Sequence, residues 1–355
     1  MIYKRCFIFL LSLFFSCGDF LGFSSFPEPK YGSIDKVKLS LNNSNLTELY
    51  ESVFENNYAP CIFQSGNVRA DALIKVRGLT SRFDRLKSFT IKIKKNDTKY
   101  TFEAGATLTN QLAMYTYSKI GLPAPETKAI NLFINDEYLG CFNRIAMYRE
   151  KSINSHYGTP SGEMYKAFFK KMGYDIPVQG MSEKKFPGDE NFRTFNLLLE
   201  KALNLSSSEW INWTARYVDK DEIAKYMAVH DFLSVRDTSL TNFYIYSYGK
   251  YIILPWDNEI SMNLDKPCEL KGHNMITRRL MEDPEIKQKY DSLMEKYFLP
   301  PVGPDDLIND LKTETLRIFN EADTAVSSNY KYFVDYSAEY NMMIDFLNNR
   351  AAQIP

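Results

Sequence analysis

A change in hydrophobic pattern along the chain does most to limit the folds open to it. In the first half, short segments that mix apolar and polar residues are separated by turn residues, as in β-sheets. The clearest is Phe89–Lys95, in which apolar and basic residues alternate. From Met275 onward, apolar residues recur at helical spacing, with a break at Pro300–Pro304. We therefore expect an α+β protein with an antiparallel sheet and hairpins in its first half and a helical C-terminal half.

The same patterns predict individual elements. A first strand is expected from Val37, and further strands at Ala72–Val76, Phe89–Lys95, Tyr100–Phe102, and the hairpin Ile130–Ile134 and Tyr138–Ile145. Helices are expected at Leu46–Phe54, Leu108–Ile120, Thr194–Leu203, Asp221–Val235, Met275–Phe298, Asp305–Ala322 and Tyr336–Ala352. The polar segment Arg149–Glu190 contains scattered Gly and Pro and is expected to be rich in loops.

The start of the chain resembles an export signal. Basic residues precede the apolar run Cys6–Phe15, which is too short to span a bilayer and fits the core of a secretory signal. Ser16-Cys17-Gly18 then resembles a bacterial lipobox. We therefore expect a signal peptide over residues 1–16, lipidation of Cys17 (palmitate included) and a tether over residues 17–36, which would anchor the protein in the cell membrane or outer membrane. Cleavage and release without lipid is the alternative.

Charge and cysteine content exclude several classes of protein. The 43 Lys and Arg nearly balance the 44 Asp and Glu, whereas a dedicated nucleic-acid binder usually carries a basic excess, so no nucleic-acid partner is expected. Apart from the leader and Cys17, the cysteines are Cys61, Cys141 and Cys268, enough for at most one disulfide. His273 follows Cys268, but no second Cys or His pair completes a zinc site, so zinc is not expected.

The stretch Val235–Asn242 carries the strongest chemical signal. It contains Arg-Asp, four further residues and then Asn, the spacing of the kinase catalytic loop. In that loop the Asp faces the substrate hydroxyl and the Asn binds a metal ion, positions filled here by Asp237 and Asn242. On its own the pattern is short enough to recur by chance.

A predicted hairpin brings a second carboxylate to the same place. With Tyr248-Gly249 as a two-residue turn, Asn242 opposes Pro255, so Asp257 lies at the same open end of the hairpin. Glu259 adds another oxygen donor. Oxygen ligands of this kind suit Mg²⁺ or Mn²⁺. A polar hairpin mouth in which Asp257 caps the next segment is the alternative.

Two further residues have competing interpretations. Lys92 lies on an alternating strand, on the face opposite Ile91 and Ile93, where a lysine can reach ATP phosphates or simply be solvated. His230 lies on an apolar helix face and is expected to be a packed, hydrogen-bonded residue. The chain has neither a G-x-G-x-x-G nor a P-loop motif, so phosphates cannot be bound by either familiar glycine loop.

Blocks of sequence from about residue 70 to the end resemble the spore-coat protein H (CotH) kinase family. They include Val76-Arg77-Gly78, Gly121-Leu122-Pro123-Ala124-Pro125, Gly162-Glu163-Met164-Tyr165-Lys166 and Leu254-Pro255-Trp256-Asp257, in the family's order. The Gly-Leu-Pro-Ala-Pro and Pro-Trp-Asp blocks are the most specific.

The resemblance implies an atypical protein-kinase-like fold over residues 37–355, with a mainly strand lobe at 37–150 and a mainly helical lobe at 151–355. It implies that ATP, with Mg²⁺ or Mn²⁺, is used to phosphorylate protein Ser or Thr, including the chain itself. It assigns Asp237 as catalytic carboxylate, Asn242 and Asp257 as metal ligands, Lys92 and Lys166 as phosphate contacts, and Arg77 as a residue that positions the nucleotide.

One departure from the family pattern concerns an acidic residue. Where the family usually has Glu, six residues after Gly140, this chain has Ala146, and the nearest acid is Glu150. This favours the alternative of a weakly active or inactive kinase-fold lipoprotein that acts as a binding or adhesion module, ahead of a plain structural lipoprotein. In either case we expect a monomer whose protein substrate or surface partner the sequence does not identify.

Overall fold

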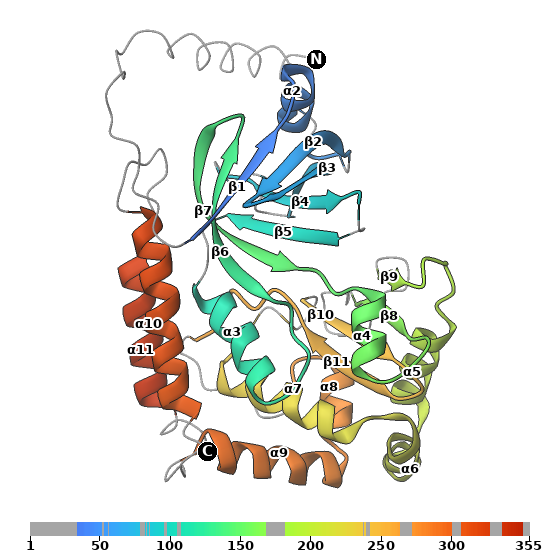
Figure 1. The fold of residues 1–355 in the computed structure, drawn as a ribbon. Helices are drawn as coiled ribbons and strands as arrows, with labels where there is room; N and C mark the ends of the chain where they lie inside the picture. The colour runs from blue at the N-terminus through green and yellow to red at the C-terminus, as the bar shows by residue number, and fades with distance from the viewer. Residues whose placement is uncertain are drawn as a thin grey trace, which may run out of the picture.

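A computed structural model describes residues 34–51, 53–55, 57–78, 82, 84, 86–95, 98–104, 108–167, 182–236, 238, 242–262, 272–299, 307–326 and 336–350. They form a closed barrel and a separate four-stranded sheet, with helices packed around that sheet and along one side (Figure 1). The expected α+β class is confirmed. The predicted signal peptide, Cys17 and Asp237 lie outside the described residues.

The barrel occupies the first part of the chain. Its strands are β1 (Asp35–Ser40), β2 (Ala59–Ser65), β3 (Val68–Arg77), β4 (Ser88–Ile93), β5 (Thr98–Ala104), β6 (Thr127–Ile134) and β7 (Glu137–Ala146), and helix α2 (Asn43–Glu51) packs on β2 and β3. The strand order is β1-β2-β3-β4-β5-β7-β6, and the barrel closes through a parallel pairing of β1 with β6. The prediction of an antiparallel sheet in this half therefore misses the parallel strand pair that closes the barrel.

Alternating side chains fill the barrel interior. On β4, Phe89, Ile91 and Ile93 are buried in the core, while Lys92 on the other face is half-buried. Ile91 and Ile93 therefore face inward and Lys92 outward, as the alternation predicted. The interior is a packed core, so ligands must bind outside it.

The second sheet has the order β11-β10-β8-β9. Its strands are β8 (Glu163–Lys166), β9 (Glu183–Phe186), β10 (Phe243–Ser247) and β11 (Tyr251–Pro255). The remaining helices are α3 (Leu108–Lys119), α4 (Glu150–His156), α5 (Arg193–Asn204), α6 (Ser207–Tyr217), α7 (Lys220–Phe232), α8 (Met275–Leu280), α9 (Pro284–Tyr297), α10 (Leu307–Val326) and α11 (Tyr336–Asn349). Helices α10 and α11 lie side by side along one edge of the molecule, and both contact α3 (Figure 1).

Three predictions about this half need correction. The segment expected to be loop-rich contains α4, β8 and β9, because β8 gains its hydrogen bonds from β10 rather than from local sequence. The helix predicted over Met275–Phe298 is two helices, since Asp283 caps the second and Pro284 occupies its first turn. The β10–β11 turn is longer than two residues: Phe243, not Asn242, opposes Pro255.

Within the described part of the chain, none of the helices has both the length and the apolar character needed to cross a bilayer. Cys61 and Cys141 are buried and unbridged, so neither contributes a disulfide.

Candidate active site

The candidate site lies where the barrel meets the end of the β10–β11 hairpin. Arg77 is the last residue of β3, and Asp257 follows β11 by two residues. Arg77 Nη2 lies 3.8 Å from Asp257 Oδ2, and both side chains are largely buried. The Arg77 guanidinium also lies 5.9 Å from the centre of the Trp256 ring. The ion pair thus connects the two halves of the molecule.

Asn242 and Asp257 occupy the same end of the hairpin, as predicted, despite the change of register. Asn242 immediately precedes the Phe243–Pro255 pair, and Asp257 follows it. Both residues have left-handed backbone conformations, with φ of 67° and 57°. Asn and Asp tolerate this conformation better than most residues, and such strained positions cluster at functional sites. Asn242 and Asp257, the two residues predicted from the sequence as metal ligands, are among six described non-glycine residues with this backbone conformation.

A buried carboxylate that sequence reasoning missed completes the acidic cluster. Glu103 of β5, Asp257 and Glu259 each place an oxygen within 4.8 Å of the others. Burial, followed by the nearby charges of Asp257 and Glu259, raises the pKa of Glu103 to about 8. The available signal was an acid inside an otherwise apolar strand end, Phe102-Glu103-Ala104.

Helix α3 positions both the buried carboxylate and the loop that carries Asp257. Asn110 Nδ2 donates to Glu103 Oε2 at 3.0 Å, and Asn110 Oδ1 accepts from the Asn258 amide at 3.1 Å. Thr109 Oγ1 donates to the Glu259 carbonyl at 3.0 Å. The first turn of α3 therefore fixes the backbone on either side of Asn258.

The same turn of α3 is tied to the C-terminal helix pair. Glu339 of α11 accepts hydrogen bonds from the Thr109 amide and hydroxyl at 3.0 and 3.1 Å. A movement of α11 would consequently shift the first turn of α3, which contacts the acidic cluster.

Lys166 supplies a second cation near Asp257. It ends β8 and pairs with Tyr244 of β10. Burial lowers the pKa of Lys166 to about 8, reinforced by Arg77 and Lys185 and opposed by Asp257 and Glu183. Lys166 is therefore close enough to Arg77 and Asp257 for their charges to affect its pKa.

Lys92 occupies a different part of the barrel surface. Arg77 pairs with Ser88 on β4, and Lys92 lies four residues farther along that strand, opposite Lys99 of β5. At strand spacing this is about 13 Å from the Arg77 end. The structure therefore brings Arg77, Lys166, Asn242, Asp257 and Glu259 to one region and places Lys92 beside Lys99.

Glu150, the acid considered as a substitute at the Ala146 position, does not take it. Ala146 ends β7, paired with Tyr100 of β5, and Glu150 is exposed at the start of α4. Glu103, on the neighbouring strand, is instead the buried acid close to Asp257.

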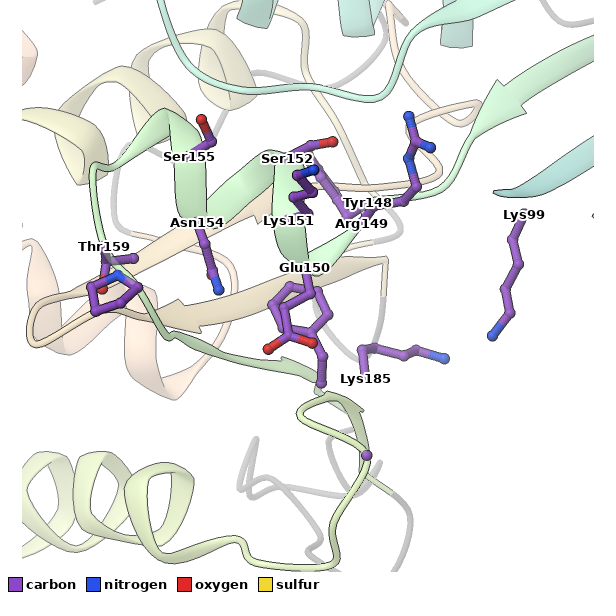
Figure 2. Close-up of a pocket in the computed structure, with 13 residues that line it drawn as sticks. Lys99, Tyr148, Arg149, Glu150, Lys151, Ser152, Asn154, Ser155, Thr159 and Lys185 are labelled. Atoms are coloured by element: carbon purple, nitrogen blue, oxygen red, sulfur yellow. The ribbon is translucent and has the colours of Figure 1, made fainter. Parts of the chain in front are cut away.

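A cavity of about 950 Å³ lies beside Lys99, between the barrel, α4 and β9. Its charged lining residues are Lys99, Arg149, Lys151, Lys185 and Glu150. Figure 2 shows Lys99 and Lys185 extending from separate elements toward the same space. Four cations against one acid make this cavity suited to an anionic ligand.

His230 behaves as predicted for a packed histidine. It is fully buried on α7, and its Nε2 is hydrogen-bonded to Thr238 Oγ1. Thr238 follows Asp237 directly, so this contact anchors the chain next to the predicted catalytic carboxylate.

Comparisons with known proteins agree on one family. The family model described as "CotH kinase protein" matches residues 74–354. The inner spore coat protein H of Bacillus subtilis (strain 168) is 20% identical over 293 residues, which are 73% of this chain and 80% of that protein.

The chain also matches solved structures, at low identity. HipA of Shewanella oneidensis MR-1, solved with HipB and operator DNA, has a TM-score of 0.33 and 10% identity, covering 92% of this chain and 74% of its own. The proinflammatory kinase CtkA of Helicobacter pylori has a TM-score of 0.29 and 12% identity, covering 75% and 88%. Both TM-scores are low, so the family assignment rests on the sequence match.

Proposed function

Because this chain belongs to the CotH kinase family, we propose that it is a protein kinase of atypical kinase-like fold. It would transfer the γ-phosphoryl group of ATP to Ser or Thr hydroxyls of proteins, itself included, and require Mg²⁺ or Mn²⁺. One observation carries the proposal: Asp257 lies both in a carboxylate cluster with Glu103 and Glu259 and in an ion pair with Arg77. The cluster suits a cation, and the arginine suits the phosphates that accompany it.

The residues present fit a divalent metal ion. The donors are hard oxygens that converge within 4.8 Å, the type that Mg²⁺ and Mn²⁺ prefer. The raised pKa of Glu103 reflects burial together with repulsion from Asp257 and Glu259, and a cation would relieve that repulsion. Asp257, Glu259 and Asn242 are the proposed ligands, with Glu103 behind them. When bound, the ion would neutralise charge on the phosphates.

The chain's own cations would bind the triphosphate. Arg77, at the end of β3, presents a planar guanidinium, and Lys166, at the end of β8, presents an ammonium. Lys92 and Lys99 would contact the nucleotide farther along the barrel face or an anionic part of the protein substrate. These roles depend on charge and position rather than covalent chemistry, as phosphoryl transfer requires.

The transfer itself is assigned to Asp237. Its carboxylate would orient the Ser or Thr hydroxyl and accept its proton as the oxygen forms a bond to the γ-phosphorus. The bond between that phosphorus and the β–γ bridging oxygen breaks, and ADP leaves. Thr238, the next residue in the chain, is hydrogen-bonded to His230.

Helix α3 is proposed to hold the active geometry. Protein kinases join a strand lysine to a helix glutamate for this purpose. Here α3 connects to the strands through neutral amides: Asn110 donates to Glu103, and Gln111 donates to Asn143 of β7 at 2.6 Å. This network offers a reason why loss of an acid at Ala146 need not abolish activity.

The direct test is transfer of label from ATP in the presence of Mg²⁺ or Mn²⁺. Wild-type protein should label itself or an added protein on Ser or Thr. Asp257→Asn should remove at least about 99% of the labelling, because even outer-shell changes cost 10–100-fold in metal affinity. Asn is the appropriate replacement since it tolerates the left-handed backbone at this position. Undiminished labelling by a folded Asp257→Asn protein would refute the ligand assignment.

A kinase-fold binding module without turnover is the second candidate, and Ala146 favours it. Thermal unfolding separates the two functions. An ATP-using enzyme should be stabilised by millimolar ATP with metal, whereas an unchanged midpoint would favour the binding module.

Location is a separate proposal. Residues 1–17 support export and lipid anchoring through Cys17. Incorporation of labelled palmitate that is lost in Cys17→Ser would support this, and unchanged incorporation in the variant would exclude it.

A further inference from the structure

A second group of ligand-type side chains lies at the C-terminal end of α7, where that helix meets the segment before α8. His230, Asp231 and His273 each place a nitrogen or a carboxylate oxygen within 4.8 Å of the others. His273 Nε2 lies 2.8 Å from Asp231 Oδ1, and His230 Nδ1 lies 3.5 Å from the same oxygen. None of these residues belongs to the acidic cluster at Asp257.

Two polar atoms of this group lack hydrogen-bond partners among the described residues. They are Nδ1 of His230 and Oδ2 of Asp231, and both side chains are fully buried. Buried polar atoms are rarely left unsatisfied, because each costs the free energy of its lost hydration. Both atoms are of the kinds that ligate metal ions, so a cation between them would remove the cost.

We propose that His230, Asp231 and His273 bind a divalent transition-metal ion of the zinc class. Zinc bonds of about 2.0–2.1 Å in tetrahedral geometry separate neighbouring ligand atoms by about 3.3 Å. The observed 2.8 and 3.5 Å, both to Asp231 Oδ1, bracket that value, so small side-chain shifts would bring three of the four ligands of such a site into place. Imidazole ligands select Zn²⁺ over Mg²⁺, which distinguishes this site from the acidic cluster.

The surroundings resemble the outer shell of a metal site. His230 Nε2 is hydrogen-bonded to Thr238 Oγ1, the kind of contact that orients a metal-bound histidine. Arg350 donates to the carbonyls of Asp231 and Phe232 at 2.7 and 2.8 Å and holds the end of α7 in place. The ion would therefore fasten α7 and the segment before α8 next to the predicted catalytic loop.

The proposal reverses an expectation from sequence. Zinc was not expected, because Cys268 and His273 are close together in the chain but no second Cys or His pair accompanies them. The carboxylate that contacts His273 is 42 residues away and is recognisable only in the folded chain.

Cobalt provides a spectroscopic test on the purified full-length chain. After removal of metal with a chelator, one equivalent of Co²⁺ should produce the visible absorption of a low-coordinate nitrogen and oxygen site, and equimolar Zn²⁺ should displace it. His273→Ala should lose the absorption. His273→Gln should lose it too while keeping a donor for Asp231, which covers the case in which the alanine variant fails to fold. His156→Ala is the matched control, because His156 is exposed on α4 and should leave the absorption unchanged.

The Asp257→Asn variant separates this proposal from the kinase function. It should retain the Co²⁺ absorption even where it has lost labelling from ATP. No absorption in wild-type protein, or equal absorption in a folded His273→Gln protein, would mean that the three residues are a hydrogen-bonded triad only. Loss of the absorption in Asp257→Asn would place the cobalt in the acidic cluster and overturn the second site.

Discussion

Arg77 and Asp257 form an ion pair across the junction of the barrel and the second sheet, with Nη2 and Oδ2 3.8 Å apart. The separation is longer than a hydrogen bond, so the two groups attract each other without being locked together. A phosphate oxygen could accept from the guanidinium while a metal ion engages the carboxylate. In the absence of ligands, the positive charge of Arg77 and the negative charge of Asp257 therefore balance each other.

Arg77→Met should weaken ATP binding by about 10–100-fold, the range for hydrogen bonds to charged groups. Arg77→Lys should recover only part of the loss, because an ammonium lacks the planar fork of the guanidinium. Calorimetric titration with ATP and Mn²⁺ measures both. Arg69→Met, at an exposed position of the same strand, is the control and should bind like wild type. Equal affinities for Arg77→Met and Arg69→Met would remove Arg77 from the nucleotide site.

Glu103→Gln should affect stability and metal binding in opposite directions. Between pH 4.5 and about 8, the folded protein keeps a proton on Glu103 that the unfolded chain has released. Stability therefore falls as pH rises through this window, by at most about 1.4 kcal/mol per pH unit. Glutamine removes this loss, so the metal-free variant should be more stable than wild type at pH 8.

The same change should weaken Mn²⁺ binding by about 10–100-fold, since a carboxylate behind the ligands is lost. Urea unfolding with and without Mn²⁺ measures both effects. Glu126→Gln, at an exposed site, should show neither. A Glu103→Gln protein that is destabilised without metal would contradict the assigned electrostatics.

Much of the fold follows from local pattern. The alternation in β4, the helical spacing of α3 and the turn residues between β6 and β7 are local signals, and those elements lie where the sequence predicts them. Strand β9 was missed because its sequence, Glu183-Lys184-Lys185-Phe186, is mostly charged. Its stability comes from pairing with β8 and from the Lys184–Glu163 ion pair at 2.9 Å, both contacts between distant segments.

The residues of the candidate site also differ in whether the local sequence predicts them. Asn242 and Asp257 could be nominated because one hairpin connects them, even with its register wrong by one residue. Glu103 could not be identified from the sequence, because its role depends on its position beside Asp257 and Glu259, which are distant in the chain. The break between α8 and α9 is a different case: the prediction of one helix over Met275–Phe298 missed it, although Asp283 followed by Pro284 is a usual helix start.

Lys166→Met should change how stability and ATP binding depend on pH. Below about pH 8 both folded and unfolded chains carry the proton, and the folded state bears the full cost of a buried ammonium. Between pH 8 and 10.5 only the unfolded chain keeps the proton, so wild-type stability should rise with pH, by up to about 3 kcal/mol. Methionine should remove that rise and give higher stability at pH 7.

Wild-type affinity for ATP should decline as pH passes 8, because the ammonium that attracts phosphate is lost, while Lys166→Met should be weak at every pH. Urea unfolding and ATP titration from pH 7 to 10 measure the two trends. Lys250→Met, exposed in the β10–β11 turn, should follow wild type. A wild-type stability that falls between pH 8 and 10 would contradict the lowered pKa.

Asp283→Ala should lower the free energy of unfolding by about 3–5 kcal/mol, the cost of leaving a buried charge without its partner. Asp283 is fully buried and lies 2.8 Å from Lys220 Nζ, and it also accepts from the Glu285 amide at 2.9 Å as the cap of α9. Its removal leaves the Lys220 ammonium, itself mostly buried, with only the exposed Glu285 carboxylate at 2.8 Å. Asp291→Ala on the same helix breaks an exposed pair with Lys287 and should cost no more than about 1 kcal/mol. Chemical denaturation of both variants measures the two losses in the free energy of unfolding. Similar losses would show that burial does not increase the contribution of the Lys220–Asp283 pair to stability.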